Sequence, residues 1–83
     1  MAVKLRLKRT GRRNRPFYRI VAADARTKRD GKSIEILGHY DPLAADKDKQ
    51  VVLERDRVQY WLGVGAQPTD TVANFLKRAG IRK

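Results

Sequence analysis

The sequence lacks cysteine altogether and contains no long apolar run. Without cysteine, the chain cannot form a disulfide, a thiolate metal site or a cysteine nucleophile. The opening letters, "MAVKLRLK", alternate apolar and basic residues, whereas a signal peptide needs an unbroken apolar stretch of roughly 7 to 15 residues. A membrane-spanning helix needs about 20 apolar residues, and no run approaches that length. We therefore expect a soluble cytoplasmic protein with no leader peptide and no membrane contact.

Groups suited to catalysis or metal binding are also scarce. His39 is the only histidine, and no neighbouring serine or acid suggests a triad. Asp46 and Asp48 resemble the first two ligands of a calcium loop, but Val51 replaces the required glycine and Arg57 the closing glutamate. These residues therefore predict no metal site, no cofactor and no catalytic cluster.

The letters "DGKS" at residues 30–33 resemble the end of a phosphate-binding P-loop. That motif requires another glycine five residues before Gly31, and this position holds Arg26. The residues after Ser33 favour a strand, so no helix N-terminus would face a phosphate there. A charged turn explains these residues better than a nucleotide site does.

Acidic residues are few in the first third of the chain, where basic residues are abundant. The net charge is +11; residues 1–32 hold twelve Lys and Arg against two acids, residues 33–57 carry −2, and residues 58–83 carry +3. So localised an excess indicates a surface for a polyanion. With 41% hydrophobic residues the chain can build one small core, and we expect residues 1–83 to form a single domain.

The densest basic segment reads "TGRRNRPFYRIV" at residues 10–21 and contains Arg12, Arg13, Arg15 and Arg19. Arginine pairs with phosphate in a bidentate manner and stacks on bases, whereas lysine would serve a merely solvated loop equally well. Nucleic acid is therefore the favoured partner. The segment also resembles a nuclear localisation signal or a minor-groove hook, but a loop held between two strands favours a folded RNA.

Period-two patterns predict the first two strands. In residues 3–8, three apolar side chains alternate with a basic ladder of Lys4, Arg6 and Lys8. Residues 9–15 contain no apolar side chain and are predicted to be a loop.

The second predicted strand covers residues 17–23, with Tyr18, Ile20 and Ala22 on one face and Phe17, Arg19 and Val21 on the other. Phe17 or Tyr18 could stack on a base, although at least one of them is expected in the core. Residues 26–32 form the second predicted basic loop.

The third predicted strand covers residues 33–40. Its alternation places Ile34, Ile36 and Tyr40 inward and Glu35 and His39 outward. A turn follows at residues 40–43, and a short strand is predicted at residues 51–53.

Two helices are predicted after this strand. The first starts at Glu54, places Val58, Trp61 and Leu62 in the core, and ends at Gly63 or Gly65.

The second helix has Thr69 as its N-cap and Gly80 at its C′ position, with Ile81 folding back. Its apolar stripe consists of Val72, Phe75, Leu76 and Ala79. These elements predict an α+β fold: a small, mainly antiparallel or mixed sheet of about four strands with two C-terminal helices packed on it.

The sequence resembles a bacterial ribosomal protein family, number sixteen of the small subunit. The resemblance runs through "VKLRLKRTGRRNRPFYRIVAADARTKRDGKSIEILGHYDPL" and "LERDRVQYWLGVGAQPTDTVANFLKRAGI". Within these segments, "RLKRTGRRNRPFYRIVAAD", "RDG", "GHYDP" and "GAQPTDTV" follow the order and spacing typical of the family. Residues 44–52 correspond to the part in which the family varies.

This resemblance implies a structural, non-enzymatic protein that binds small-subunit ribosomal RNA, contacts neighbouring ribosomal proteins and assists subunit assembly. It is not expected to form homo-oligomers. The family's RNA-facing basic positions correspond to Arg6, Lys8, Arg9, Arg12, Arg13, Arg15, Arg19, Arg26, Lys28, Arg29 and Lys32. A DNA-binding module is the first alternative, because the same charge would support it. A small hydrolase or nuclease is the second, and the scarcity of acids and histidine disfavours it.

Overall fold

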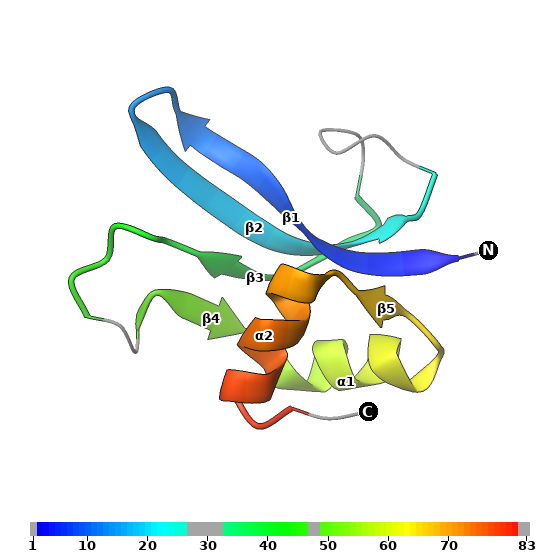
Figure 1. The fold of residues 1–83 in the computed structure, drawn as a ribbon. Coiled ribbons are helices and arrows are strands. Elements are labelled where there is room, and N and C mark those ends of the chain that lie inside the picture. Colours follow the sequence, from blue (N-terminus) through cyan, green and yellow to red (C-terminus); the bar gives the residue numbers. More distant parts are fainter. Residues whose placement is uncertain (1, 27–32, 47–48, 82–83) are drawn as a thin grey trace.

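The computed structural model describes residues 2–26, 33–46 and 49–81. Its elements follow in the order β1 (Val3–Arg12), β2 (Arg15–Asp24), β3 (Glu35–Tyr40), β4 (Val51–Leu53), α1 (Arg55–Gly63), β5 (Gln67–Pro68) and α2 (Asp70–Arg78). The strands form one mixed sheet in the order β4-β3-β2-β1-β5, in which only β5 pairs in parallel. Both helices lie on the same side of this sheet (Figure 1). The predicted α+β fold is confirmed, with five strands rather than about four.

A continuous β1–β2 hairpin replaces the loop predicted over residues 9–15. The two strands pair as far as Arg12 and Arg15, so only a two-residue turn separates them. The prediction of a loop was wrong because an alternating apolar pattern reveals a strand only where one face is buried. The hairpin extends beyond the helices (Figure 1), and its outer half has no such face.

Gly11 allows the hairpin to close with its strands in register. Its φ is +90°, and a Cβ there would lie 2.7 Å from the backbone oxygen of Arg15. We expect Gly11→Ala to lower the free energy of unfolding by about 1–3 kcal/mol, because a side chain is strained at this φ. Urea denaturation measures the loss. Gly63→Ala is the control, since a Cβ there meets nothing within 4 Å; equal stability of the two variants would contradict this role of Gly11.

A β-bulge in β3 determines which of its residues reach the core. Ile20 pairs with Gly38 and Val21 pairs with Ile36, so Leu37 is an extra residue in the register. The bulge breaks the strict two-residue alternation of β3. Leu37 is fully buried and joins the core cluster.

The bulge explains why the predicted faces of β3 hold only in part. Ile34 and Ile36 are 48% and 49% exposed, so their predicted inward orientation was wrong. Glu35 was predicted to point outward, but it lies on the helix side, where its carboxylate accepts two hydrogen bonds from Arg57 of α1. Tyr40 packs against the core as predicted.

Helix α1 lies close to its predicted position. Glu54 is its N-cap, and Val58 and Leu62 are its buried residues. Trp61 was predicted to be a core residue; it is partly buried and packs against the edge of the core cluster.

Helix α2 begins and ends as the sequence predicts. Thr69 is the N-cap residue, and its backbone N–H donates to the carbonyl oxygen of Leu5 at 2.9 Å. At the other end, Gly80 adopts a φ of +75°, and the N–H of Ile81 donates to the carbonyl oxygen of Leu76 at 2.9 Å. This Schellman arrangement returns the chain to the core, where Ile81 is buried.

The core lies between the helices and one face of the sheet. Its buried members are Leu5, Ile20, Ala22, Leu37, Val58, Leu62, Ala66, Val72, Phe75, Leu76 and Ile81. Within the described part of the chain, neither helix has the length and apolar character needed to cross a membrane.

Candidate nucleic-acid interface

The face of the sheet opposite the helices, termed the open face, presents the side chains that alternate with the core residues. Leu5 and Ile20 are fully buried against the helices, so their neighbours along β1 and β2 point the other way. The open face thus presents Lys4, Arg6, Lys8, Phe17, Arg19, Ile36, His39 and Val52, while Val21 lies on the same face but is buried.

The strand register places two cations directly opposite each other on this face. Lys8 pairs with Arg19, Arg19 pairs with His39, and His39 pairs with Val52, which forms one row across four strands. Like charges at directly opposite positions destabilise a sheet, and a bound polyanion removes that repulsion. Arg19, predicted within the second strand, therefore shares its face with Arg6 and Lys8.

The arginines near the hairpin turn do not all share the open face. Arg9 pairs with Tyr18 and so lies on the opposite side of β1 from Lys8, and its Nη2 donates to the carbonyl oxygen of Arg13 at 3.4 Å. Arg13 lies exposed in the turn, and Arg12 pairs with Arg15 next to that turn. The arginines near the turn are therefore divided between the two faces of the hairpin and its tip.

Arg15 forms an ion pair that the sequence did not reveal. Its Nη1 and Nη2 donate to Oδ1 and Oδ2 of Asp41 at 2.8 and 2.9 Å. The hydrogen bonds from Arg15 hold the pKa of Asp41 below its usual value, and the same pair raises the pKa of Arg15. Asp41 also accepts the N–H of Leu43 at 3.0 Å. Arg15 thus fastens the hairpin to the segment after β3.

A second ion pair fastens β3 to α1. Arg57 donates to both carboxylate oxygens of Glu35 at 2.6 Å, and Nε1 of Trp61 donates to Oε1 at 3.3 Å. The bonds from Arg57 lower the pKa of Glu35.

The two lowered carboxylate pKa values predict an acid-dependent loss of stability. Protonation is easier in the unfolded chain, where the ordinary values are 4.5 for Glu35 and 3.8 for Asp41. The stabilisation is thus complete above about pH 5 and is lost as the pH falls through the lower folded pKa values. Denaturant midpoints measured from pH 7 to pH 2 check this. Glu35→Gln/Asp41→Asn should start less stable and respond less to acid; a wild-type slope in this variant would contradict the prediction.

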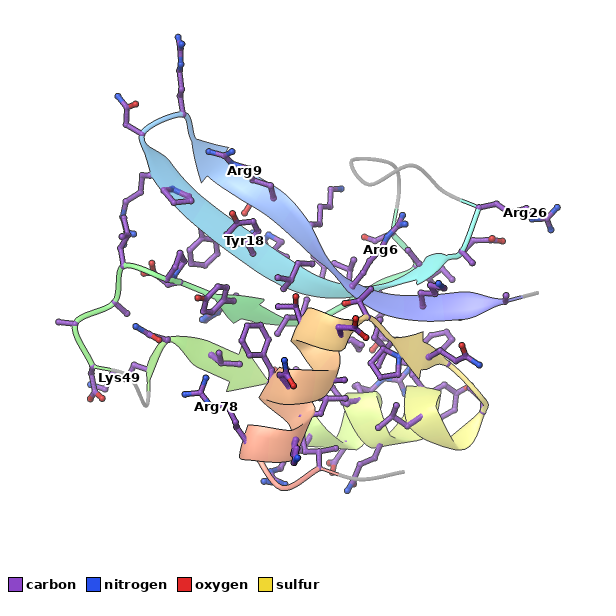
Figure 2. The ribbon with its side chains drawn as sticks, in the orientation of Figure 1. Arg6, Arg9, Tyr18, Arg26, Lys49 and Arg78 are labelled. Atoms are coloured by element: carbon purple, nitrogen blue, oxygen red, sulfur yellow. The ribbon has the colours of Figure 1, made fainter. Side chains whose placement is uncertain are left out.

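Arg26 lies at the opposite end of the sheet from Arg9, with Arg6 between them (Figure 2). Its backbone N–H donates to Oδ1 of Asp24 at 2.9 Å, and its side chain is exposed. Lys28, Arg29 and Lys32, with the predicted turn at residues 30–31, lie outside the described residues.

The two neighbouring aromatic residues of β2 have different roles. Tyr18 lies on the helix side, stacked on Tyr40 with the ring centroids 5.9 Å apart, and Tyr40 in turn packs against the core cluster. Phe17 lies on the open face and stacks on His39 at 5.4 Å. The predicted outward orientation of His39 is confirmed, but its pairing with Phe17 depends on the strand register and was missed.

Acidic residues and histidine do not gather into a pocket in the part of the chain that the structure describes. No three His, Asp or Glu side chains among these residues lie close enough together to hold a metal ion. Two hollows, of about 310 and 320 Å³, border α2, and neither is lined by His, Asp or Glu. Charged side chains are instead concentrated on the open face and on the hairpin beside it.

Comparison with known proteins identifies related sequences. The family model for ribosomal protein S16 matches residues 9–69. A Chlorobaculum tepidum protein named small ribosomal subunit protein bS16 is 60% identical over 79 residues, which cover 95% of this chain and 58% of that relative. Proteins of the same name from Rickettsia rickettsii and Chlorobium limicola are 55% and 57% identical. The Rickettsia match covers 98% of this chain and 74% of that relative. The Chlorobium match covers 95% of this chain and 58% of that relative.

Proposed function

Because this chain belongs to the ribosomal protein S16 family, we propose that it is a structural, non-enzymatic constituent of the small ribosomal subunit. The resemblance seen in the sequence is confirmed by this membership. In the proposed function, residues 1–83 act as one domain that binds small-subunit ribosomal RNA, contacts neighbouring ribosomal proteins and assists assembly of the subunit in the cytoplasm. The protein acts as a monomer before it joins the subunit.

The observation that carries the RNA-binding proposal is the pairing of Lys8 with Arg19 on the open face. A sheet gains no stability from two cations placed opposite each other, whereas a phosphate between them would be attracted by both. Arg6, two residues before Lys8 on β1, lies on the same face and adds a third cation beside this pair. The hairpin tip with Arg13 adds a second point of contact for a folded backbone.

Shape and phosphate recognition suits this set of side chains better than sequence reading does. Folded RNA is recognised largely through its backbone and 2′-hydroxyl groups, and phosphate contacts fix the position of a protein on it. The open face is rich in Lys and Arg and, among the residues assigned to it, has no Asn or Gln for reading base edges. The same argument places a DNA-binding role second.

A salt titration tests this function. Each phosphate that the protein neutralises releases counterions, so we expect log K for small-subunit ribosomal RNA to fall with log salt by about 0.7–0.9 per contact. Filter binding or fluorescence anisotropy from 50 to 400 mM salt measures the slope. A flat response, or tighter binding to duplex DNA at matched salt, would contradict the proposal.

A further inference from the structure

The open face is divided into a cationic half and an apolar half. Cations follow β1, whereas β3 and β4 present Ile36 and Val52, which are 49% and 46% exposed. Arg19 and His39 lie between these halves in the row that begins at Lys8. A ligand that covers the whole face must therefore be anionic along one edge and apolar along the other.

The centre of this face is a stacked aromatic pair. The Phe17 ring and the His39 ring lie 5.4 Å apart at an interplanar angle of 30°. Phe17 is partly exposed and is not among the side chains that pack against the core cluster. Its neighbour Tyr18 points to the other side of the sheet, where it stacks on Tyr40. The aromatic ring of Phe17 therefore contributes to a surface rather than to the interior.

We propose that the open face binds an unpaired stretch of RNA, with phosphates along β1 and one nucleobase stacked on the Phe17–His39 pair. This inference rests on the proposed RNA-binding function and names the kind of RNA at this face. Two strand spacings, about 9–10 Å, separate β1 from β3, a span that a nucleotide bridges from phosphate to base. Lys8 and Arg19 hold the phosphates, and the ring pair accepts the base.

An unpaired strand fits this face better than a duplex does. In a duplex the bases are stacked on each other and their faces are unavailable, whereas splayed bases of loops and junctions stack on aromatic side chains. A protein partner fits less well, because an apolar interface over Ile36 and Val52 would also cover Lys8 and Arg19 and remove water from their charges. Single-stranded RNA is complementary to this face, because its anionic phosphates lie beside its apolar bases.

Fluorescence of 2-aminopurine tests the stacked base. The probe is an eight-nucleotide single-stranded RNA with 2-aminopurine at a central position, and stacking quenches its emission. We expect wild-type protein to quench it. Phe17→Leu should weaken binding roughly 5- to 100-fold and abolish the quenching while leaving the salt slope unchanged. Phe17→Tyr should keep the quenching. Tyr60→Leu, which removes a half-exposed aromatic ring from α1, is the control and should bind as the wild type does.

The outcomes separate this inference from the function on which it rests. Salt-dependent binding to ribosomal RNA without quenching of the single-stranded probe would overturn the stacked base and leave the proposed function standing. Equal affinity of Phe17→Leu and wild type for the probe would also overturn it, provided that both have the same thermal midpoint. Unchanged RNA binding together with failed incorporation of Phe17→Leu into the small subunit would overturn it in favour of a protein contact at this face.

Discussion

Gly38→Ala should cause the larger of the two stability losses expected from glycine substitutions in this sheet. A Cβ at Gly38 would lie 2.0 Å from the carbonyl oxygen of Val52, 3.0 Å from the carbonyl carbon of Val52 and 3.1 Å from Cα of Leu53. All three atoms belong to the backbone of β4, so no side-chain rotation relieves the overlap. The two strands must separate, or β3 must lose its register.

The consequences extend beyond one pair of residues. Two further backbone hydrogen bonds hold β3 and β4 together at their ends. The N–H of Glu54 donates to the carbonyl oxygen of Leu37, and the N–H of Asp41 donates to that of Gln50, each at 2.7 Å. Displacement of β4 weakens these hydrogen bonds and the packing of Val51 and Leu53 on the core. We therefore expect a loss of about 3 kcal/mol, at the upper end of the effect of overpacking.

Thermal unfolding followed by circular dichroism measures this loss. For a domain of this size, about 3 kcal/mol corresponds to a midpoint lowered by roughly 12–24 °C. Gly63→Ala is again the control, since it adds the same methyl group with no atom within 4 Å. A Gly38→Ala midpoint within a few degrees of the wild type would show that β3 and β4 do not approach as closely as described.

Gly38 also explains why the sequence predicts β3 less well than the helices. A glycine inside a strand accompanies a bulge or the close approach of another backbone, and here it accompanies both. The alternation of residues 33–40 contains no sign of the extra residue at Leu37. In α2, by contrast, the helical period, the N-cap and the C′ glycine all indicate the same boundaries, because one face of that helix is buried along its length.

The outer half of the hairpin was unpredictable for a related physical reason. Its strand character comes from backbone pairing and from Gly11, while its side chains are basic on both faces. Hydrophobic patterns report burial, and this half buries little. The two-residue strand β5 was missed because so short a segment carries no period at all, and it contains Pro68.

The candidate site was predictable in composition and unpredictable in arrangement. The charge distribution directed attention to Arg6, Lys8 and Arg19, and the register brings these three to one face. The separation of Arg9 from them follows from the alternation once β1 is known to continue past Lys8. The partner of Arg15 lies 26 residues away and depends on how β2 and β3 align, which local sequence does not specify.

Lys8→Ala/Arg19→Ala is expected to cause the largest loss of ribosomal RNA binding among double substitutions of the open face. A hydrogen bond to a charged group contributes about 1.5–3 kcal/mol, and exposure favours the lower end of that range. Two lost phosphate contacts therefore weaken binding by about 3 kcal/mol, or roughly 100-fold near physiological salt. The slope of log K against log salt should become shallower by about 1.4–1.8. Anisotropy measured over the salt series gives both quantities.

Folding stability should change in the opposite direction. Lys8 and Arg19 are directly opposite like charges, so removing both relieves a repulsion of about 0.2–1 kcal/mol in the free protein. The variant should unfold at the same or a higher urea concentration than the wild type. A loss of binding with unchanged or improved stability would mean that the two side chains serve a partner and not the fold.

The control must remove the same charges from elsewhere. Lys49→Ala/Arg78→Ala also replaces one lysine and one arginine, and both side chains lie away from Arg6, Arg78 on α2 and Lys49 just before β4 (Figure 2). It should lose less than about fivefold in affinity, because distant exposed charges are screened beyond about 10 Å at 0.1 M salt. Equal losses in the two double variants would mean that net charge drives binding, and the open face would then have no special part in it. Unequal losses, with the shallower slope confined to Lys8→Ala/Arg19→Ala, would identify the phosphate-binding surface by position rather than by charge.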